Sequence, residues 1–145
     1  MSVAREIFAR LRAGNKRYVS GETEHDPLSH QERRTLLSDT QAPSAIVLGC
    51  SDSRVPAELV FDQGLGDLFV IRVAGNIVAP SQVGSVEFAA AQYGVRLVVV
   101  LGHTKCGAIQ ATLDQLQQPS ELQSKNLASI VSRIQPVVSG LLRTD

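Results

Sequence analysis

Ala45-Ile46-Val47-Leu48-Gly49 is an apolar run that leads directly into the polar segment Cys50-Ser51-Asp52-Ser53-Arg54. A second such run, Arg96-Leu97-Val98-Val99-Val100-Leu101-Gly102, leads into His103-Thr104-Lys105-Cys106-Gly107. A third run, Asp67–Val73, lies between them. All three are rich in Val, Ile and Leu without clean alternation of apolar and polar residues, which is typical of strands buried on both faces. We therefore predict three parallel strands in an α/β fold.

Helical patterns separate and flank these predicted strands. Residues 56–61 indicate a short helix between the first and second strands, and Val83–Tyr93, ended by Gly94, indicates a longer one before the third. The order β-α-β-α-β favours parallel strands with right-handed crossovers. If the two crossovers lie on opposite sides, the first strand is central and the sheet order is 2-1-3. The other helices are expected at residues 3–19, 29–37, 108–117 and 122–142, with Pro136 kinking or splitting the last.

The bulk composition indicates a single globular domain. The chain has 145 residues, of which 43% are hydrophobic. We expect residues 1–40 to form an N-terminal helical arm and residues 43–145 to form the α/β core. The 14 basic and 14 acidic residues balance, so no excess of positive charge indicates binding to nucleic acid or an anionic membrane. No signal peptide and no apolar stretch near the ~20 residues of a membrane span is evident, so we expect a cytoplasmic protein.

The two cysteines of the chain and a histidine are placed for metal binding. Cys50 and His103 follow neighbouring strands, so both lie at the carboxyl edge of the predicted sheet, and Cys106 comes three residues after His103. Two thiolates and one imidazole suit a catalytic zinc ion, which keeps a further position open for water. Asp52 could take that position or accept a hydrogen bond from the water, and Arg54 could hold the carboxylate. The alternatives are buried core thiols or a disulfide, although a disulfide does not suit a reducing compartment.

Several segments together resemble the β-class carbonic anhydrases. The two signatures of that family are similar to residues 50–55 and 103–108, and the likeness extends to residues 11–18 and 61–76. The resemblance implies reversible hydration of carbon dioxide to bicarbonate and a proton by zinc-bound hydroxide, a lyase reaction. It also implies a homodimer or higher homo-oligomer. Rival functions are hydrolysis of carbon disulfide or carbonyl sulfide on the same fold, or a zinc-bound assembly module without turnover.

The resemblance also implies roles for individual residues. One zinc ion per chain would be bound by Cys50, His103 and Cys106, with Asp52 as a fourth ligand in a closed, inactive state. In the open state Arg54 would hold Asp52, and both are expected as catalytic residues. Two residues are expected to bind substrate: Gln63, acting across a dimer interface, and Gly107, through its backbone N–H group.

The end of the chain is expected to differ from the family pattern. The family normally continues past the last predicted helix with further strands, which are absent from this sequence. We therefore expect a carboxyl-terminally shortened form, with the third strand as an open edge and a weakened oligomer. His25 and His30 are expected to be exposed, and no proton-relay residue is evident.

Overall fold

The computed structural model describes residues 2–24, 29–119 and 124–141. Its sheet contains three parallel strands, β1 (Ala45–Gly49), β2 (Leu68–Arg72) and β3 (Val98–Leu101), in the order β2-β1-β3. The predicted central position of the first strand is confirmed. Gly49, the last residue of β1, pairs with Arg72 of β2 and Leu101 of β3, so all three strands end at one edge of the sheet.

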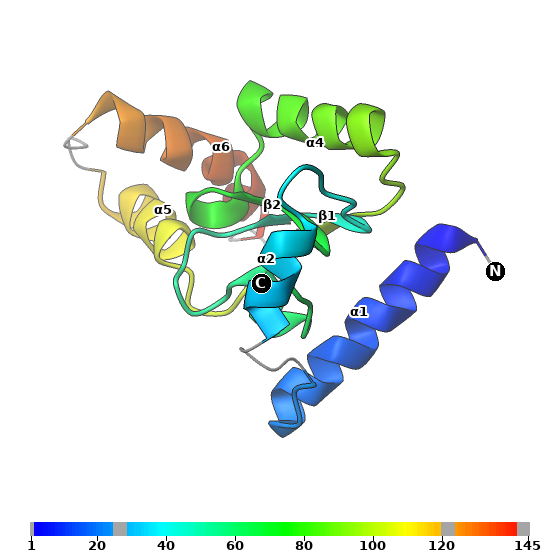
Figure 1. The fold of residues 1–145 in the computed structure, drawn as a ribbon. Coiled ribbons are helices and arrows are strands. Elements are labelled where there is room, and N and C mark those ends of the chain that lie inside the picture. Colours follow the sequence, from blue (N-terminus) through cyan, green and yellow to red (C-terminus); the bar gives the residue numbers. More distant parts are fainter. Residues whose placement is uncertain (1, 25–28, 120–123, 142–145) are drawn as a thin grey trace.

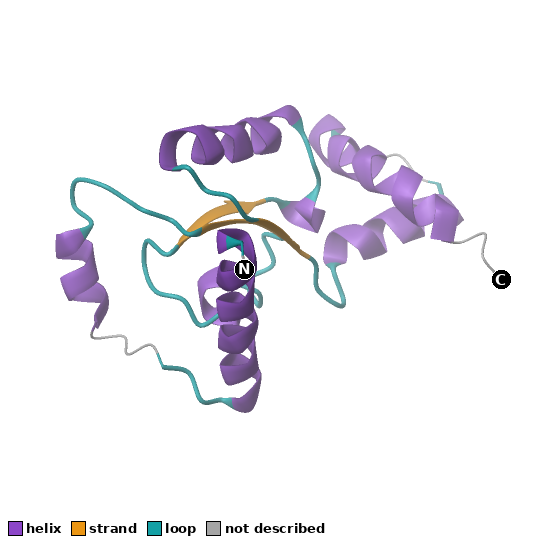
Figure 2. Ribbon diagram, turned by 90° about the vertical axis from the view of Figure 1, so that its right-hand side faces the viewer, coloured by secondary structure: helices purple, strands orange, loops and turns teal. Residues whose placement is uncertain are grey.

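β1 is buried along its whole length because helices cover both faces of the sheet. Figure 2 shows α4 (Pro80–Tyr93) above the sheet and α1 (Val3–Ser20) below it. Ile46 and Leu48 pack in the core on the α4 side. Ala45 and Val47 pack on the other side, in a core that also includes residues of α1 and of the short helix α3 (Ala57–Val60). This two-sided burial explains why the sequence of β1 lacks polar alternation.

The helices begin and end close to the predicted positions. α1 ends before Gly21 and α4 ends before Gly94, and both glycines adopt the left-handed conformation that favours this residue at a helix end. α4 begins three residues before its predicted start, at Pro80, because a proline fits the first turn of a helix, where no N–H donor is needed. α2 spans Ser29–Leu36. None of the helices in the described ranges combines the length and apolar character needed to cross a bilayer.

Two helices and a single helical turn lie beyond the carboxyl edge of the sheet. α5 (Gly107–Gln117) packs against α6 (Lys125–Leu141), and both contact the 3-10 turn η1 (Ala74–Asn76) that follows β2 (Figure 1). α6 continues across Pro136, so of the expected kink or split, the split does not occur. The first residues predicted for this helix, 122 and 123, and its last, Leu142, lie outside the described residues.

Truncating a fully buried side chain of α1 should destabilise the fold. The Leu11 side chain is 1% exposed and packs with Val47 and Phe61, so Leu11→Ala should lower the free energy of unfolding by roughly 2–5 kcal/mol. Val19→Ala is a matched control on the same helix because Val19 is 77% exposed and should cost little. Denaturant unfolding of the two variants checks this. Equal midpoints would show that α1 does not contribute to the core.

Candidate metal centre

Cys50, His103 and Cys106 meet at the carboxyl edge of the sheet. Cys50 directly follows β1, His103 follows β3 after Gly102, and Cys106 precedes the first residue of α5. Because β1 and β3 are neighbours and end together, residues 53 positions apart in the sequence become adjacent. One ligand atom from each of the three side chains lies within 4.8 Å of the others. The expected clustering of these side chains is therefore present.

The donor geometry of the two cysteines fits zinc. Cys50 and Cys106 are free and buried, and their Sγ atoms are 3.9 Å apart. A disulfide requires a separation of about 2.05 Å. Two thiolates on one tetrahedral zinc ion, each about 2.3 Å from the metal, are about 3.8 Å apart. The observed spacing thus matches a shared metal and excludes a disulfide in this structure.

His103 presents an unpaired nitrogen to the same place. Its Nδ1 atom lies 2.9 Å from the carbonyl oxygen of Thr104, and a neutral ring that donates this hydrogen bond has its lone pair on Nε2. The side chain is 8% exposed, and Nε2 is buried without a hydrogen-bond partner among the residues that the structure describes. Buried polar atoms are rarely left unpaired, so this atom needs a ligand that the described residues do not supply. A metal ion held with the two thiolates meets that need.

The surroundings of Cys50 favour its thiolate form. Burial alone would raise the pKa of this thiol, but hydrogen bonding from the His103 imidazole in its protonated form, from the backbone N–H groups of Asp52 and Gly75, and from the thiol of Cys106 lowers that pKa to about 7. The Gly75 N–H donates to Cys50 Sγ over 3.3 Å. Since the thiolate is the form that binds metals, these donors prepare Cys50 as a ligand.

Asp52 and Arg54 form a bidentate ion pair beside the three candidate ligands. Arg54 donates from Nε to Asp52 Oδ1 over 2.8 Å and from Nη2 to Oδ2 over 2.7 Å. These hydrogen bonds hold the pKa of the Asp52 carboxyl well below its usual range, so Asp52 is an anion. Asp52 Oδ2 lies 4.0 Å from His103 Nε2. Of the two arrangements considered from the sequence, the structure shows the one in which Arg54 holds Asp52.

Two residues that were not singled out from the sequence support the candidate ligands. Arg72, the last residue of β2, donates from Nε to the Cys50 carbonyl and from Nη2 to the Asp52 carbonyl, and so fixes the backbone of the turn after β1. Gly75 supplies the N–H group that faces Cys50 Sγ. In the sequence, Arg72 could have been noticed as a charged residue at the end of an apolar run. Gly75 gave only a turn signal.

Replacing Gly75 should weaken zinc binding without removing a ligand. A Cβ at this position would lie 2.8 Å from Ile134 Cδ1 and 3.0 Å from Ala108 Cβ, and the φ angle is 69°. Gly75→Ala should therefore move the N–H away from Cys50 and lower zinc affinity about 10-fold or more. Gly94→Ala is the matched control, because Gly94 has a φ of 65° but no atoms near its Cβ position. Zinc competition with a chromogenic chelator checks this, and equal affinities in the two variants would contradict it.

The two expected substrate-binding residues lie in different surroundings. Gly107 is exposed, begins α5 directly after Cys106, and has open space where a Cβ would be. Gln63 is buried in the turn after α3, and its Nε2 donates to the carbonyls of Phe61 and Asp62. These two Gln63 contacts are with its own turn and not with the metal centre. His25 and the side chain of His30 lie outside the described residues.

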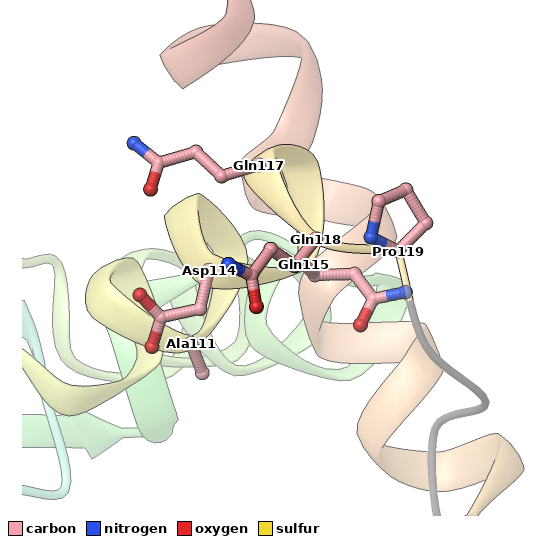
Figure 3. Close-up of a pocket in the computed structure, with 6 residues that line it drawn as sticks. All are labelled: Ala111, Asp114, Gln115, Gln117, Gln118 and Pro119. Carbon is pink, nitrogen blue, oxygen red and sulfur yellow. The ribbon is translucent and has the colours of Figure 1, made fainter.

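A surface hollow in the described part of the chain lies away from these candidate ligands. It encloses about 640 Å³ beside the second half of α5, and Figure 3 shows its lining of glutamines, Asp114, Ala111 and Pro119. These side chains include no cysteine or histidine, and Asp114 accepts a hydrogen bond from Gln110. The hollow therefore does not offer a second metal centre of the same kind.

Comparisons with known proteins agree with the family resemblance of the sequence. The family model described as carbonic anhydrase matches residues 45–144. The chain is 46% identical to a carbonic anhydrase of Mycolicibacterium smegmatis and 41% identical to carbonic anhydrase 2 of Mycobacterium tuberculosis, in each case over 93% of this chain and 67% of the relative. It also resembles the solved structure of a tetrameric β-carbonic anhydrase from Sordaria macrospora, with a TM-score of 0.67 and 25% identity over 97% of this chain and 71% of that one. The chain thus spans about two thirds of the length of these relatives.

Proposed function

Since the chain belongs to the β-class carbonic anhydrase family, we propose that it catalyses the reversible hydration of carbon dioxide to bicarbonate and a proton. We further propose that it does so with one zinc ion per chain on Cys50, His103 and Cys106. The observation that carries this proposal is the close group of two thiols and an unpaired imidazole nitrogen, next to an anionic carboxylate. Zinc bound there would lower the pKa of a bound water and supply a nucleophile near neutral pH.

Asp52 and Arg54 are proposed to orient the nucleophile. Asp52 is an anion that Arg54 fixes through two side-chain hydrogen bonds. Its position 4.0 Å from His103 Nε2 allows a carboxylate oxygen to accept a hydrogen bond from a water molecule in the metal centre. Arg54 also donates to the carbonyl of Lys105 over 3.2 Å, so the pair is tied to the turn between His103 and Cys106. Such a fixed acceptor would direct a lone pair of the water oxygen toward carbon dioxide.

Gly107 and Gln63 are proposed to bind substrate. Gly107 is exposed and directly follows Cys106, and its proposed contact with substrate is through its backbone N–H group. Gln63 is engaged within its own turn, and its proposed role is to serve the site of a second copy of the chain. These assignments follow the family resemblance of residues 61–76 and 103–108.

A homodimer or higher homo-oligomer is proposed because apolar surface is left uncovered. Val98 and Val100 of β3 are 46% and 63% exposed, and α1 exposes Phe8, Tyr18 and Val19. Burying such side chains against a second copy would stabilise the assembly. The Sordaria macrospora relative is described as tetrameric. We also propose a cytoplasmic location, since a reducing compartment would maintain the two free thiols.

The deciding experiment measures zinc content and carbon dioxide hydration on one purified sample. We expect about one zinc ion per chain and a hydration rate, followed by stopped flow with a pH indicator, that rises in proportion to zinc content. Sulfide release from carbon disulfide or carbonyl sulfide in place of hydration would reassign the reaction. Full zinc occupancy without turnover on any of these substrates would favour the assembly module and overturn the proposal.

A further inference from the structure

α1 contacts the turn that carries Gln63 at unusually close range. A Cβ built on Gly14 would lie 1.8 Å from the carbonyl oxygen of Phe61, so the helix and the turn can approach this closely only with glycine at position 14. The next residue, Asn15, donates from Nδ2 to the carbonyl of Val60 over 3.0 Å. Asn15 therefore holds the Val60 carbonyl directly before the turn, and Gly14 lies against the Phe61 carbonyl at the start of the turn.

A partly buried ion pair adds a third attachment. Arg17 donates from Nε to Oδ2 of Asp62, and the Glu24 N–H donates to the same oxygen over 3.1 Å. Asp62 is 3% exposed, and the hydrogen bond with its carboxylate raises the pKa of Arg17. A charged carboxylate is costly to bury unless it is paired in this way.

Asp62 also needs to be held because of its backbone. Its φ angle of 48° lies in the left-handed region, which residues with a Cβ seldom adopt. This conformation sets the direction of the chain into Gln63. The Nε2 atom of Gln63 donates hydrogen bonds to the carbonyls of Phe61 and Asp62. The orientation of the Gln63 amide thus depends on two carbonyls, one in contact with Gly14 and the other belonging to the residue that Arg17 binds.

We propose that Arg17 is a positioning residue that, through Asp62, holds the turn of residues 61–63 so that Gln63 is presented to substrate. This inference rests on the proposed function, because it gives Gln63 a substrate-binding role. Arg17 itself touches no part of the Cys50, His103 and Cys106 group among its described contacts. Its loss should therefore affect catalysis through Gln63 and leave zinc binding intact.

The test compares Arg17→Ala with Gln63→Ala and with the double variant. We expect each single variant to keep about one zinc ion per chain and to lose about 10-fold or more in kcat/KM for carbon dioxide. If Arg17 acts through Gln63, the double variant should be no worse than Gln63→Ala. Arg12→Ala, an exposed arginine on a different face of the same helix, is the matched control and should leave kcat/KM unchanged.

Further measurements separate positioning from a general loss of stability. Hydrogen exchange should accelerate in residues 57–67 of Arg17→Ala and stay unchanged around Cys50 and Cys106, and Arg17→Lys, which keeps the charge, should recover part of the activity. Losses that multiply in the double variant, or unchanged exchange in the turn, would overturn the positioning role while leaving the proposed function standing. A zinc-loaded parent chain without hydration activity would instead overturn the proposed function, and the positioning role with it.

Discussion

Replacing Cys50 by serine or His103 by alanine is expected to abolish zinc binding and carbon dioxide hydration together. The three ligand atoms lie within 4.8 Å of one another, and each would contribute one bond of the proposed tetrahedral zinc site. A serine hydroxyl is a far weaker zinc ligand than a thiolate at neutral pH, and alanine supplies no donor. Zinc content should therefore fall from about one ion per chain to near zero, and hydration should fall to the rate of the uncatalysed reaction. Metal analysis and stopped-flow hydration on the same samples measure both.

Thr104→Ala is the matched control for the histidine variant. Thr104 is exposed, and it contacts the imidazole of His103 through its backbone carbonyl, which the substitution leaves in place. Zinc content and activity should both be retained in this variant. A Cys106→Ser variant that is metal-free yet fully active would contradict the assignment of the centre.

The candidate ligands could be located from the sequence because their placement depends on local patterns. The apolar run of β1 ends at Gly49, and the run of β3 ends at Leu101, so the polar residues that follow had to lie at one edge once the strands were parallel neighbours. The order 2-1-3 followed from placing the two helical crossovers on opposite sides of the sheet, and the structure has this order. These inferences need only strand boundaries and handedness, which apolar periodicity indicates well.

The supporting contacts could not be predicted because they join segments that are distant in the sequence. Arg72 reaches the carbonyls of Cys50 and Asp52 across a strand pair, and whether a charged residue at a strand end turns toward a neighbour depends on the packed structure. A glycine is favoured at position 75 because side chains of α5 and α6 lie close to where a Cβ would be, and both helices come more than 30 residues later in the sequence. The attachment of Arg17 to Asp62 likewise spans 45 residues. Such contacts are tertiary and leave no periodic signal.

Asp52→Ala is expected to separate zinc binding from turnover. Asp52 lies outside the group of three ligand atoms, and its carboxylate is held by Arg54, so the variant should keep about one zinc ion per chain. Without the Asp52 carboxylate, a water molecule in the metal centre would have no fixed acceptor for its hydrogen bond and would lose its orientation. The loss should be about 10²-fold or more in kcat, as is typical when a positioned acid–base group is removed. Metal analysis beside stopped-flow hydration measures this, and an unchanged kcat would contradict the role of Asp52.

Replacing Arg54 tests the role of Asp52 in a second way, because the proposed effect of Arg54 on turnover depends on Asp52. Arg54→Ala removes both side-chain hydrogen bonds and the main cause of the low Asp52 pKa, so the carboxylate becomes free to leave its position. A freed Asp52 could occupy the open position at the metal, which makes Arg54→Ala at least as inactive as Asp52→Ala.

In the double variant of Asp52→Ala and Arg54→Ala no carboxylate remains to occupy that position, and its kcat should equal that of Asp52→Ala alone. Recovery of activity from Arg54→Ala to the double variant would show that the ion pair keeps the carboxylate off the metal. Losses that multiply would show that Arg54 acts on the reaction independently of Asp52.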